Sequence, residues 1–312
     1  FNLLVPSNFQ GTQRLDTYVS EHTEHMNRSK LKSGATEIFI NSKKAKLSSK
    51  IRTGDSITIN WEDAVPENIE PENIPLDIIF ENDDVTVVNK AQGMVTHPAA
   101  GNWSGTLVNA LLYRWNQKAV KNTVSKRPGI VHRLDKETSG IIITARNRLS
   151  EDFLQQQFQK RHVQKEYIAI VSGRPPHKGG VISTQIIRDP GNRKRFKAVG
   201  NTVEGKYAKT IYHCIACYGN YSLMRFRLKT GRTHQIRVHA KFIGCPILGD
   251  SVYNQKKEEL FPDATLMLHS RFLKIWLPGE KKAATFYAAV PVRFKKVLAS
   301  LHSKFRKEII TK

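Results

Sequence analysis

The segment from residue 129 to 143, GIVHRLDKETSGIII, concentrates residue types that could carry out chemistry. Two carboxylates, Asp135 and Glu137, lie between two apolar runs. Asp135 has basic residues on both sides, and hydroxyl residues follow it. Asp, Lys, Thr, Ser and Gly after an apolar strand are also ordinary turn residues, which explains the composition of the segment but not its order. A protein-kinase catalytic loop would need His-Arg-Asp and an upstream Gly-rich loop, and the sequence has neither. The order of its residues therefore makes this segment the first candidate for an active site.

Residues 200–207, GNTVEGKY, match a phosphate-binding loop up to the last position. There Tyr207 stands where a Ser or Thr hydroxyl would bind Mg²⁺, and residues 208–212 predict a strand where a helix is required. We therefore expect no nucleotide cofactor.

The cysteines and histidines do not predict a metal or redox site. Cys214 and Cys217 form a lone C-x-x-C in an apparent strand, where positions i and i+3 point to opposite faces, and Cys245 is the third thiol. We interpret all three as buried structural thiols. Three histidines lie in segments without a second carboxylate or thiol at metal-ligand spacing, namely His132, His234 and His239. We predict no metal site and no cofactor of any kind.

The composition favours a polyanionic partner. The chain has 312 residues and carries 50 Lys and Arg against 27 Asp and Glu, for a formal charge of +23. Such a basic surface can serve solubility alone, but it also attracts nucleic acid. With three cysteines, no apolar run long enough to span a membrane and no signal-peptide pattern in residues 1–11, we expect a cytoplasmic protein in a reducing compartment.

The charges are unevenly distributed and indicate the domain boundaries. Residues 61–84 hold nine acidic residues, no basic one and three prolines, so we interpret them as a linker. We accordingly predict an N-terminal extension over residues 1–12, a small basic domain over 13–60 and a large basic domain over 85–312. In the large domain we expect strands near 85–88, 141–144, 167–171, 208–215, 221–228 and 286–290. Many of these follow one another without a helix, which predicts an α+β fold with a mixed, largely antiparallel sheet.

Helical patterns cover residues 106–115 and 150–160, a segment beginning at Thr233, and the tail from Val292. We expect Thr233 to cap its helix, which places Arg237 in the first turn, and Gly244 and Pro246 to end it. The amphipathic tail carries apolar residues on one face, and we expect that face to pack on the domain: Phe294, Leu298, Leu301 and Phe305.

The small domain reads as two short helices followed by strands. The sequences RLDTYVSEH, NRSKLKSG and FINSKKAKLSSKIRTGDSITI resemble, in order and spacing, the S4 domain, a module that lays a basic helical face on folded RNA. A generic α+β appendage with a solvated face is the alternative. The resemblance implies phosphate contacts from Arg28, Lys30, Lys32, Lys43, Lys44 and Lys46.

Three ordered segments of the large domain resemble the signature motifs of the RluA-type pseudouridine synthases. They are HRLDKETSGIIITAR from residue 132, QKEYIAIV from residue 164 and LKTGRTHQIRVH from residue 228. Segments around residues 89–98, 105–111 and 244–253 also match, so that the resemblance extends from residue 13 to about 292. One departure is Ala91, where the family usually has proline after the Asn-Lys pair.

This resemblance implies isomerisation of uridine to pseudouridine in RNA, with Asp135 as the catalytic carboxylate. It also implies that Arg237 is the cation beside Asp135 and that the ring of Tyr167 stacks on the uracil. Burial raises the pKa of a carboxyl group, so a neighbouring cation is needed to keep it ionised. The base must leave its stack, and Arg133 is the candidate to fill the gap, with His132 bordering the site. Further RNA contacts are expected from Arg193, Lys194, Arg195, Lys197 and Arg232.

The pairing of an S4-like domain with this catalytic domain resembles the branch that acts on large-subunit ribosomal RNA. We therefore expect ribosomal RNA as the partner, with transfer RNA as the alternative, no membrane, and a monomer. Two other functions are considered. The first is a non-catalytic ribosomal RNA-binding assembly factor that retains the fold, and the second is a metal-dependent nuclease, which would need clustered carboxylates and Mg²⁺.

Overall fold

The computed structural model describes residues 2–23, 28, 31–32, 35–61, 68–99, 101–116, 120–121, 128–192, 195–200, 202–254 and 259–305. The chain forms two compact units. The first comprises Phe1–Asn68 with Ala99–Trp103 and Lys121–Thr123, and the second comprises the rest. Of the predicted RNA-contacting residues, three lie outside the described residues: Lys30, Arg193 and Lys194.

The first unit has a four-stranded antiparallel sheet of order β1-β6-β3-β4, made of β1 (Asn2–Leu4), β6 (Ser56–Trp61), β3 (Ala35–Ile40) and β4 (Lys43–Lys44). A second pair joins β2 (Gln13–Arg14) to β5 (Lys50–Ile51). Helix α1 (Leu15–His22) buries Leu15, Tyr18 and Val19 in the core. The predicted first helix is thus present. Residues 1–12 were predicted to be an extension outside this domain. In the structure β1 pairs with β6, so this part of the chain belongs to the sheet of the first unit.

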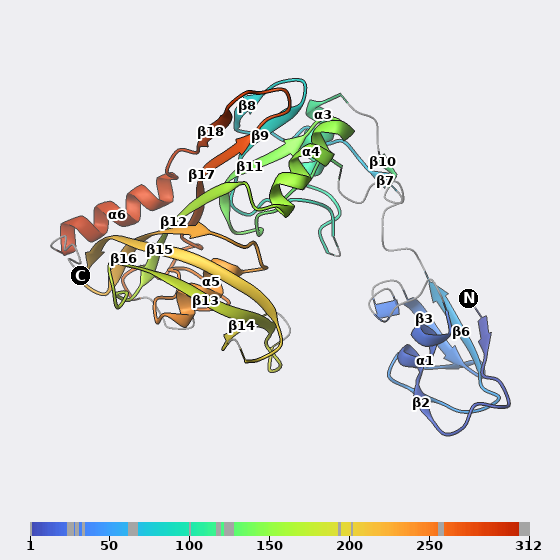
Figure 1. Ribbon diagram of the computed structural model, residues 1–312. Coiled ribbons are helices and arrows are strands. Elements are labelled where there is room, and N and C mark those ends of the chain that lie inside the picture. The colour runs from blue at the N-terminus through green and yellow to red at the C-terminus, as the bar shows by residue number, and fades with distance from the viewer. Residues whose placement is uncertain are drawn as a thin grey trace. The chain divides into compact units, whose positions relative to one another are not determined.

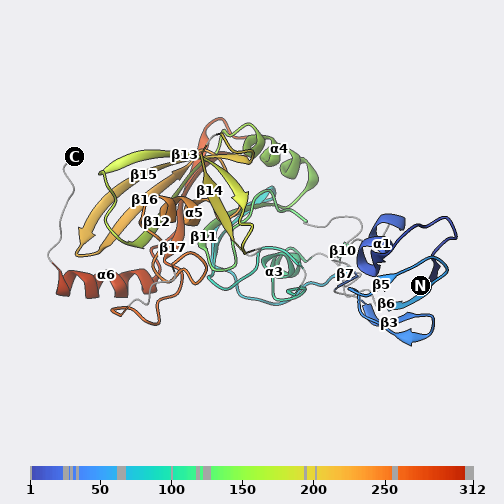
Figure 2. The same cartoon turned by 90° about the horizontal axis from the view of Figure 1, so that it is seen from below.

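The second unit is built on a ten-stranded sheet of order β14-β13-β15-β16-β12-β17-β11-β9-β8, with β18 paired to β17 (Figures 1 and 2). Its strands are β8 (Ile78–Glu81), β9 (Val85–Lys90), β11 (Ser139–Ala145), β12 (Gln164–Ser172), β13 (Gly179–Arg188), β14 (Phe196–Val199), β15 (Lys206–Tyr218), β16 (Tyr221–Leu228), β17 (Leu268–Trp276) and β18 (Ala283–Tyr287). The pair β11–β17 is parallel, and the other described pairs are antiparallel. A short separate pair joins β7 (Asn68–Ile69) to β10 (Val120–Lys121). The predicted α+β class with a mixed, largely antiparallel sheet is confirmed.

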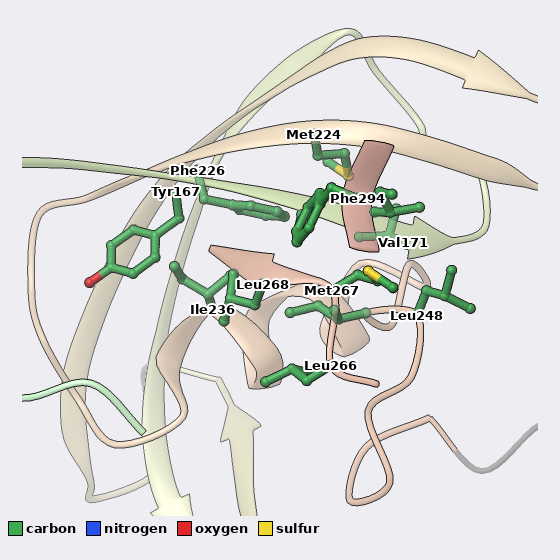
Figure 3. Packing of buried hydrophobic residues seen from close by; sticks show 14 of the residues in the cluster. Tyr167, Val171, Met224, Phe226, Ile236, Leu248, Leu266, Met267, Leu268 and Phe294 are labelled. Atoms are coloured by element: carbon green, nitrogen blue, oxygen red, sulfur yellow. The ribbon is translucent and has the colours of Figure 1, made fainter. Parts of the chain in front are cut away.

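Four helices of this unit are described: α3 (Leu107–Arg114), α4 (Arg148–Gln159), α5 (Gln235–Phe242) and α6 (Val292–Lys304). Helix α4 packs against β11 and β17, and α5 packs against β14 and β15. Phe294 of α6 packs against Val171 of β12 and Met224 of β16 (Figure 3). Phe294 and Leu301 are fully buried in the main core, so the expectation that the tail packs on the domain is confirmed.

Two local expectations are wrong. Helix α5 begins at Gln235 after His234, whose φ is 54°, and no side chain caps it, so Thr233 is not the cap. In β15 the pairing register shifts between Cys214 and Ala216. This bulge reverses the expected alternation and brings the thiols of Cys214 and Cys217 to 3.5 Å. All three cysteines are buried, as expected.

The predicted boundaries of the linker also differ from the structure. Residues 78–81 of the acidic segment form β8, which pairs with β9 and extends the large sheet. This strand contains three consecutive apolar residues, 78–80, but the surrounding density of acidic residues led to its interpretation as part of the linker. Among the described residues no helix combines the length and apolar character needed to cross a bilayer.

Candidate active site

The loop that carries Asp135 is held by the segment that follows β9. The Thr96 hydroxyl donates to the Leu134 carbonyl at 2.9 Å, and the backbone N–H of Gly93 donates to the Lys136 carbonyl at 2.9 Å. The fully buried Lys90 Nζ donates to the same Lys136 carbonyl at 3.2 Å and to two carbonyls of its own turn. These bonds tie the carbonyls on both sides of Asp135 to one rigid turn, which fixes the position of the carboxylate.

Gly140, near the start of β11, allows the strand that follows the Asp135 loop to pack closely against β17. Its φ is +111°, and a Cβ at this position would lie 2.1 Å from the Ser270 carbonyl oxygen. A side chain here would push β17 away from β11, because both backbones meet closely at their parallel pairing. Glycine therefore holds the Asp135 loop beside the strand that carries Ser270.

Helix α5 brings a guanidinium to Asp135. Arg237 Nη1 lies 3.8 Å from Asp135 Oδ2, and the Arg237 side chain is 7% exposed. Two other nitrogens of Arg237 donate to the fully buried Asp250 carboxylate at 2.8 and 2.7 Å. Asp250 also accepts from the backbone N–H groups of Val252 and Tyr253 at 3.0 Å. This bidentate pair fixes the plane of the guanidinium, so that its remaining edge faces Asp135.

A histidine that precedes α5 forms the second contact of Asp135. His234 Nε2 lies 3.7 Å from Asp135 Oδ2, and Nδ1 shares a hydrogen bond of 2.9 Å with the Tyr253 hydroxyl. The left-handed backbone of His234 turns its side chain toward the loop. Burial is the main effect on its pKa, which is lowered, so the ring is neutral at neutral pH. The sequence interpretation gave no role to His234, Tyr253 or Asp250.

Tyr167 faces the same site from β12. Its ring is 6% exposed, and in Figure 3 it lies at the edge of the hydrophobic cluster, beside Ile236 of α5, with its hydroxyl directed away from the cluster. Burial raises the pKa of Tyr167 to about 12, although a hydrogen bond with Ser270 lowers it in part. The phenol is therefore protonated at neutral pH and can donate a hydrogen bond.

These side chains line one cavity of about 450 Å³. Six of the residues predicted from the sequence contribute to its wall: His132, Arg133, Asp135, Tyr167, Arg232 and Arg237. Arg133 is exposed, as a side chain that enters an RNA stack would have to be. The Arg232 Nε donates to the Tyr207 carbonyl at 3.0 Å, which holds this guanidinium at the rim.

His132 has a different environment from the one expected of an RNA contact. Its Nε2 accepts a hydrogen bond from the Ile143 backbone N–H at 3.0 Å, and its ring stacks on Phe158 at 4.6 Å between centroids. Burial lowers its pKa to about 3. His132 is therefore a neutral residue in the wall of the cavity. Its contacts with Ile143 and Phe158 connect the Asp135 loop to β11 and α4.

The other described basic residues that were predicted to contact RNA are not among those that line the cavity. Arg195 directly precedes β14 and is half-buried. Lys197 lies in β14 and is exposed. In the first unit Arg28 donates to Asp16 at 3.1 Å, so its guanidinium is already engaged. The remaining predicted contacts of that unit are exposed: Lys32, Lys43, Lys44 and Lys46. No group of three or more potential metal ligands occurs within the described part of the chain.

Solved structures define the class of this fold. The human RNA pseudouridylate synthase domain-containing proteins 4 and 1 superpose with a TM-score of 0.59 each, at 23% and 24% identity. The match to protein 4 covers 75% of this chain and 95% of that one, and the match to protein 1 covers 76% and 91%. The second unit thus has the pseudouridine synthase fold.

Sequence comparison establishes the family. The RNA pseudouridylate synthase family matches residues 84–242. Ribosomal large subunit pseudouridine synthase D of Borreliella burgdorferi is 42% identical over 90% of this chain and 87% of its own. The enzyme of the same name from Zymomonas mobilis is 39% identical over 78% of each chain. The chain belongs to the RNA pseudouridylate synthase family, and it is an isomerase that acts on uridine in RNA.

Proposed function

We propose that this enzyme converts specific uridines of large-subunit ribosomal RNA to pseudouridine, with Asp135 as the catalytic residue and no cofactor. The observation that carries the proposal is the placement of the Asp135 carboxylate, 23% exposed, in a cavity between Arg237 at 3.8 Å and His234 at 3.7 Å. The names of the Borreliella and Zymomonas relatives support the choice of RNA.

The reaction needs no atoms beyond those of the substrate. The C1′–N1 bond of the uridine breaks, the base turns, a C1′–C5 bond forms, C5 gives up its proton to solvent and N1 takes up a proton. A carboxylate can assist by attacking the sugar, by attacking the base or by removing a proton from C2′. Each route needs an ionised carboxylate beside the nucleotide. The guanidinium of Arg237 lies 3.8 Å from this carboxylate and attracts its negative charge.

The other cavity residues receive roles that match their surroundings. The Tyr167 ring stacks on the extruded uracil, and its protonated hydroxyl can pass the C5 proton. The exposed Arg133 fills the gap that the uridine leaves in the RNA stack. The exposed lysines of the first unit, which resembles an S4 domain, contact phosphates elsewhere on the RNA.

The test is the substitution Asp135→Asn, which keeps the size of the side chain and removes its charge. RNA transcripts labelled with tritium at C5 of uridine release the label when pseudouridine forms. We expect the variant to release label at least about 1,000-fold more slowly than wild type. Its affinity for a large-subunit ribosomal RNA transcript should be unchanged. Asp263→Asn, at an exposed carboxyl group, is the matched control and should be fully active.

Four results would contradict the proposal. Asp135→Asn turnover near that of wild type would remove Asp135 from the chemistry. Absence of tritium release from wild type, with tight binding, would favour the assembly factor. Faster release from transfer RNA than from ribosomal RNA transcripts would show that the substrate class is wrong. A wild-type reaction that stops in the presence of a chelator would favour a metal-dependent mechanism.

A further inference from the structure

The cavity contains a lysine that the reaction described above does not use. Lys165 lies two residues before Tyr167 in β12, so both side chains point to the same face of the strand, and both line the cavity. The Lys165 side chain is partly buried, and its Nζ lies 5.2 Å from the centroid of the Phe158 ring. Within the described residues it forms no ion pair with a carboxylate. A cation removed from water usually has an anionic partner, and this one lacks it.

The surroundings hold this ammonium group in place without neutralising it. Phe158 lies below it, and His132 stacks on Phe158 in turn, fixed by its bond from the Ile143 backbone. On another side, a Cβ at Gly231 would lie 3.7 Å from Lys165 Nζ. A side chain at Gly231 would therefore contact the ammonium group, and glycine leaves that space free. The arrangement keeps a positive charge in the cavity wall, supported by aromatic rings.

The charges of the cavity are unbalanced. Asp135 is the one carboxylate among the lining residues, and it already faces His234 and Arg237. The remaining cations of the wall have no lining carboxylate to face: Arg133, Arg161, Lys165, Lys229 and Arg232. An RNA nucleotide brings one negative charge on each of its flanking phosphates. The substrate therefore supplies the charge that the cavity lacks.

We propose that the Lys165 ammonium binds a phosphodiester oxygen adjoining the extruded uridine whose base lies against Tyr167. The spacing agrees with this arrangement, because residues i and i+2 of a strand are about 6.6 Å apart and the phosphate is separated from the base by the ribose. Lys165 is then a substrate-binding residue that positions the nucleotide beside Asp135. This inference rests on the proposed function.

The binding should depend on pH. Burial lowers the pKa of Lys165 to about 8, whereas the bound phosphate requires the protonated amine. The lowered pKa values of His132 and His234 leave both rings neutral above pH 7. Affinity for RNA should therefore fall as the pH rises through about 8. Lys90 is another amine with a lowered pKa, about 7, but it lies behind the Asp135 loop and donates to backbone carbonyls.

Three variants test the proposal, with a large-subunit ribosomal RNA transcript as the probe. Lys165→Met keeps the length of the side chain and removes the charge, and Lys165→Arg keeps the charge at all accessible pH values. Lys274→Met, at an exposed lysine of the neighbouring strand β17, is the matched control. Binding is measured against salt concentration and pH, and KM and kcat are obtained from tritium release. Thermal unfolding establishes that each variant is folded.

For Lys165→Met we expect KM to rise at least about tenfold, and the slope of log K against log salt to decrease by about 0.7–0.9, the value for one phosphate contact. Lys165→Arg should bind as wild type does at pH 7 and lose the decline near pH 8. Lys274→Met should match wild type in each measurement.

An unchanged slope and KM in Lys165→Met would overturn the proposal. A lower kcat with unchanged KM and slope would also overturn it, because Lys165 would then act on the base during the reaction. Failure of the proposed function is recognised separately, since wild type and Lys274→Met would then release no tritium while the salt slopes could still be compared.

Discussion

Arg237 makes two contacts, and its role at Asp135 can be separated from its role in the fold. Its bidentate pair with Asp250 is buried, whereas its Nη1 atom lies 3.8 Å from Asp135 Oδ2. At an effective dielectric constant near 20, two unit charges at this distance attract by about 4 kcal/mol before desolvation is subtracted. Since a tenfold change in rate corresponds to about 1.4 kcal/mol, loss of the guanidinium should lower turnover about 100- to 1,000-fold.

The single variant Arg237→Gln mixes two effects. It removes the cation from Asp135, and it leaves the fully buried Asp250 carboxylate unpaired. Breaking a buried ion pair in this way lowers the free energy of unfolding by about 3–5 kcal/mol. The double variant Arg237→Gln with Asp250→Asn replaces the ion pair with two amides, which can hydrogen-bond to each other. It should recover most of the lost unfolding free energy.

The assay compares the two variants. Urea unfolding measures stability, and tritium release measures turnover. We expect the double variant to be nearly as stable as wild type and to remain about 100-fold or more below it in turnover. If turnover returned together with stability, to within about threefold of wild type, Arg237 would act only as the partner of Asp250 and its contact with Asp135 would not contribute to turnover.

Two further predictions concern buried groups. Tyr167→Phe keeps the ring and removes the hydroxyl, so we expect RNA affinity to stay the same and turnover to fall at least about tenfold, whereas Tyr167→Leu should also lose about 1–3 kcal/mol of binding. Equal turnover in wild type and Tyr167→Phe would limit the residue to stacking. The fully buried His239 has a pKa lowered to about 4 by burial, below its ordinary value of 6.5. The unfolded chain takes up this proton first as the pH falls, so the stabilisation is complete above pH 6.5 and is lost toward pH 4, by about 2 kcal/mol at pH 5. His239→Gln should therefore unfold in urea with a smaller pH dependence between 7 and 5, and an unchanged dependence would contradict the assignment.

Much of the fold could be predicted because its determinants are local. The apolar runs that form β9, β11, β12 and β16, and the amphipathic pattern of α6, appear directly in the sequence. The wrong predictions concern features that depend on contacts with other segments of the chain. The bulge in β15 depends on its register with β16, and it brings Cys214 and Cys217 together against the simple alternation.

In the candidate site, too, some residues could be identified from sequence order and others only from their contacts in the fold. Asp135, Tyr167 and Arg237 each lie in a long ordered motif, so sequence order was enough to single them out. Asp250 and His234 also lie in matching segments, but sequence order did not assign them a role, because their importance comes from contacts with Arg237 and Asp135 that are made across the fold. Lys165 lies in the motif that begins at residue 164, but its position beside the Phe158 ring in the cavity wall, without an ion pair among the described residues, became apparent only in the structure.

The sequence by itself was enough to predict the family resemblance, the α+β class and Asp135 as the candidate catalytic carboxylate, since residue type and order carry that information. The tertiary structure alone decided which charges face one another in the cavity. Electrostatic interactions depend on distances of a few ångströms and on exclusion of water, and these are set by packing between segments far apart in the chain. The pairing of Arg237 with both Asp135 and Asp250 is the main example.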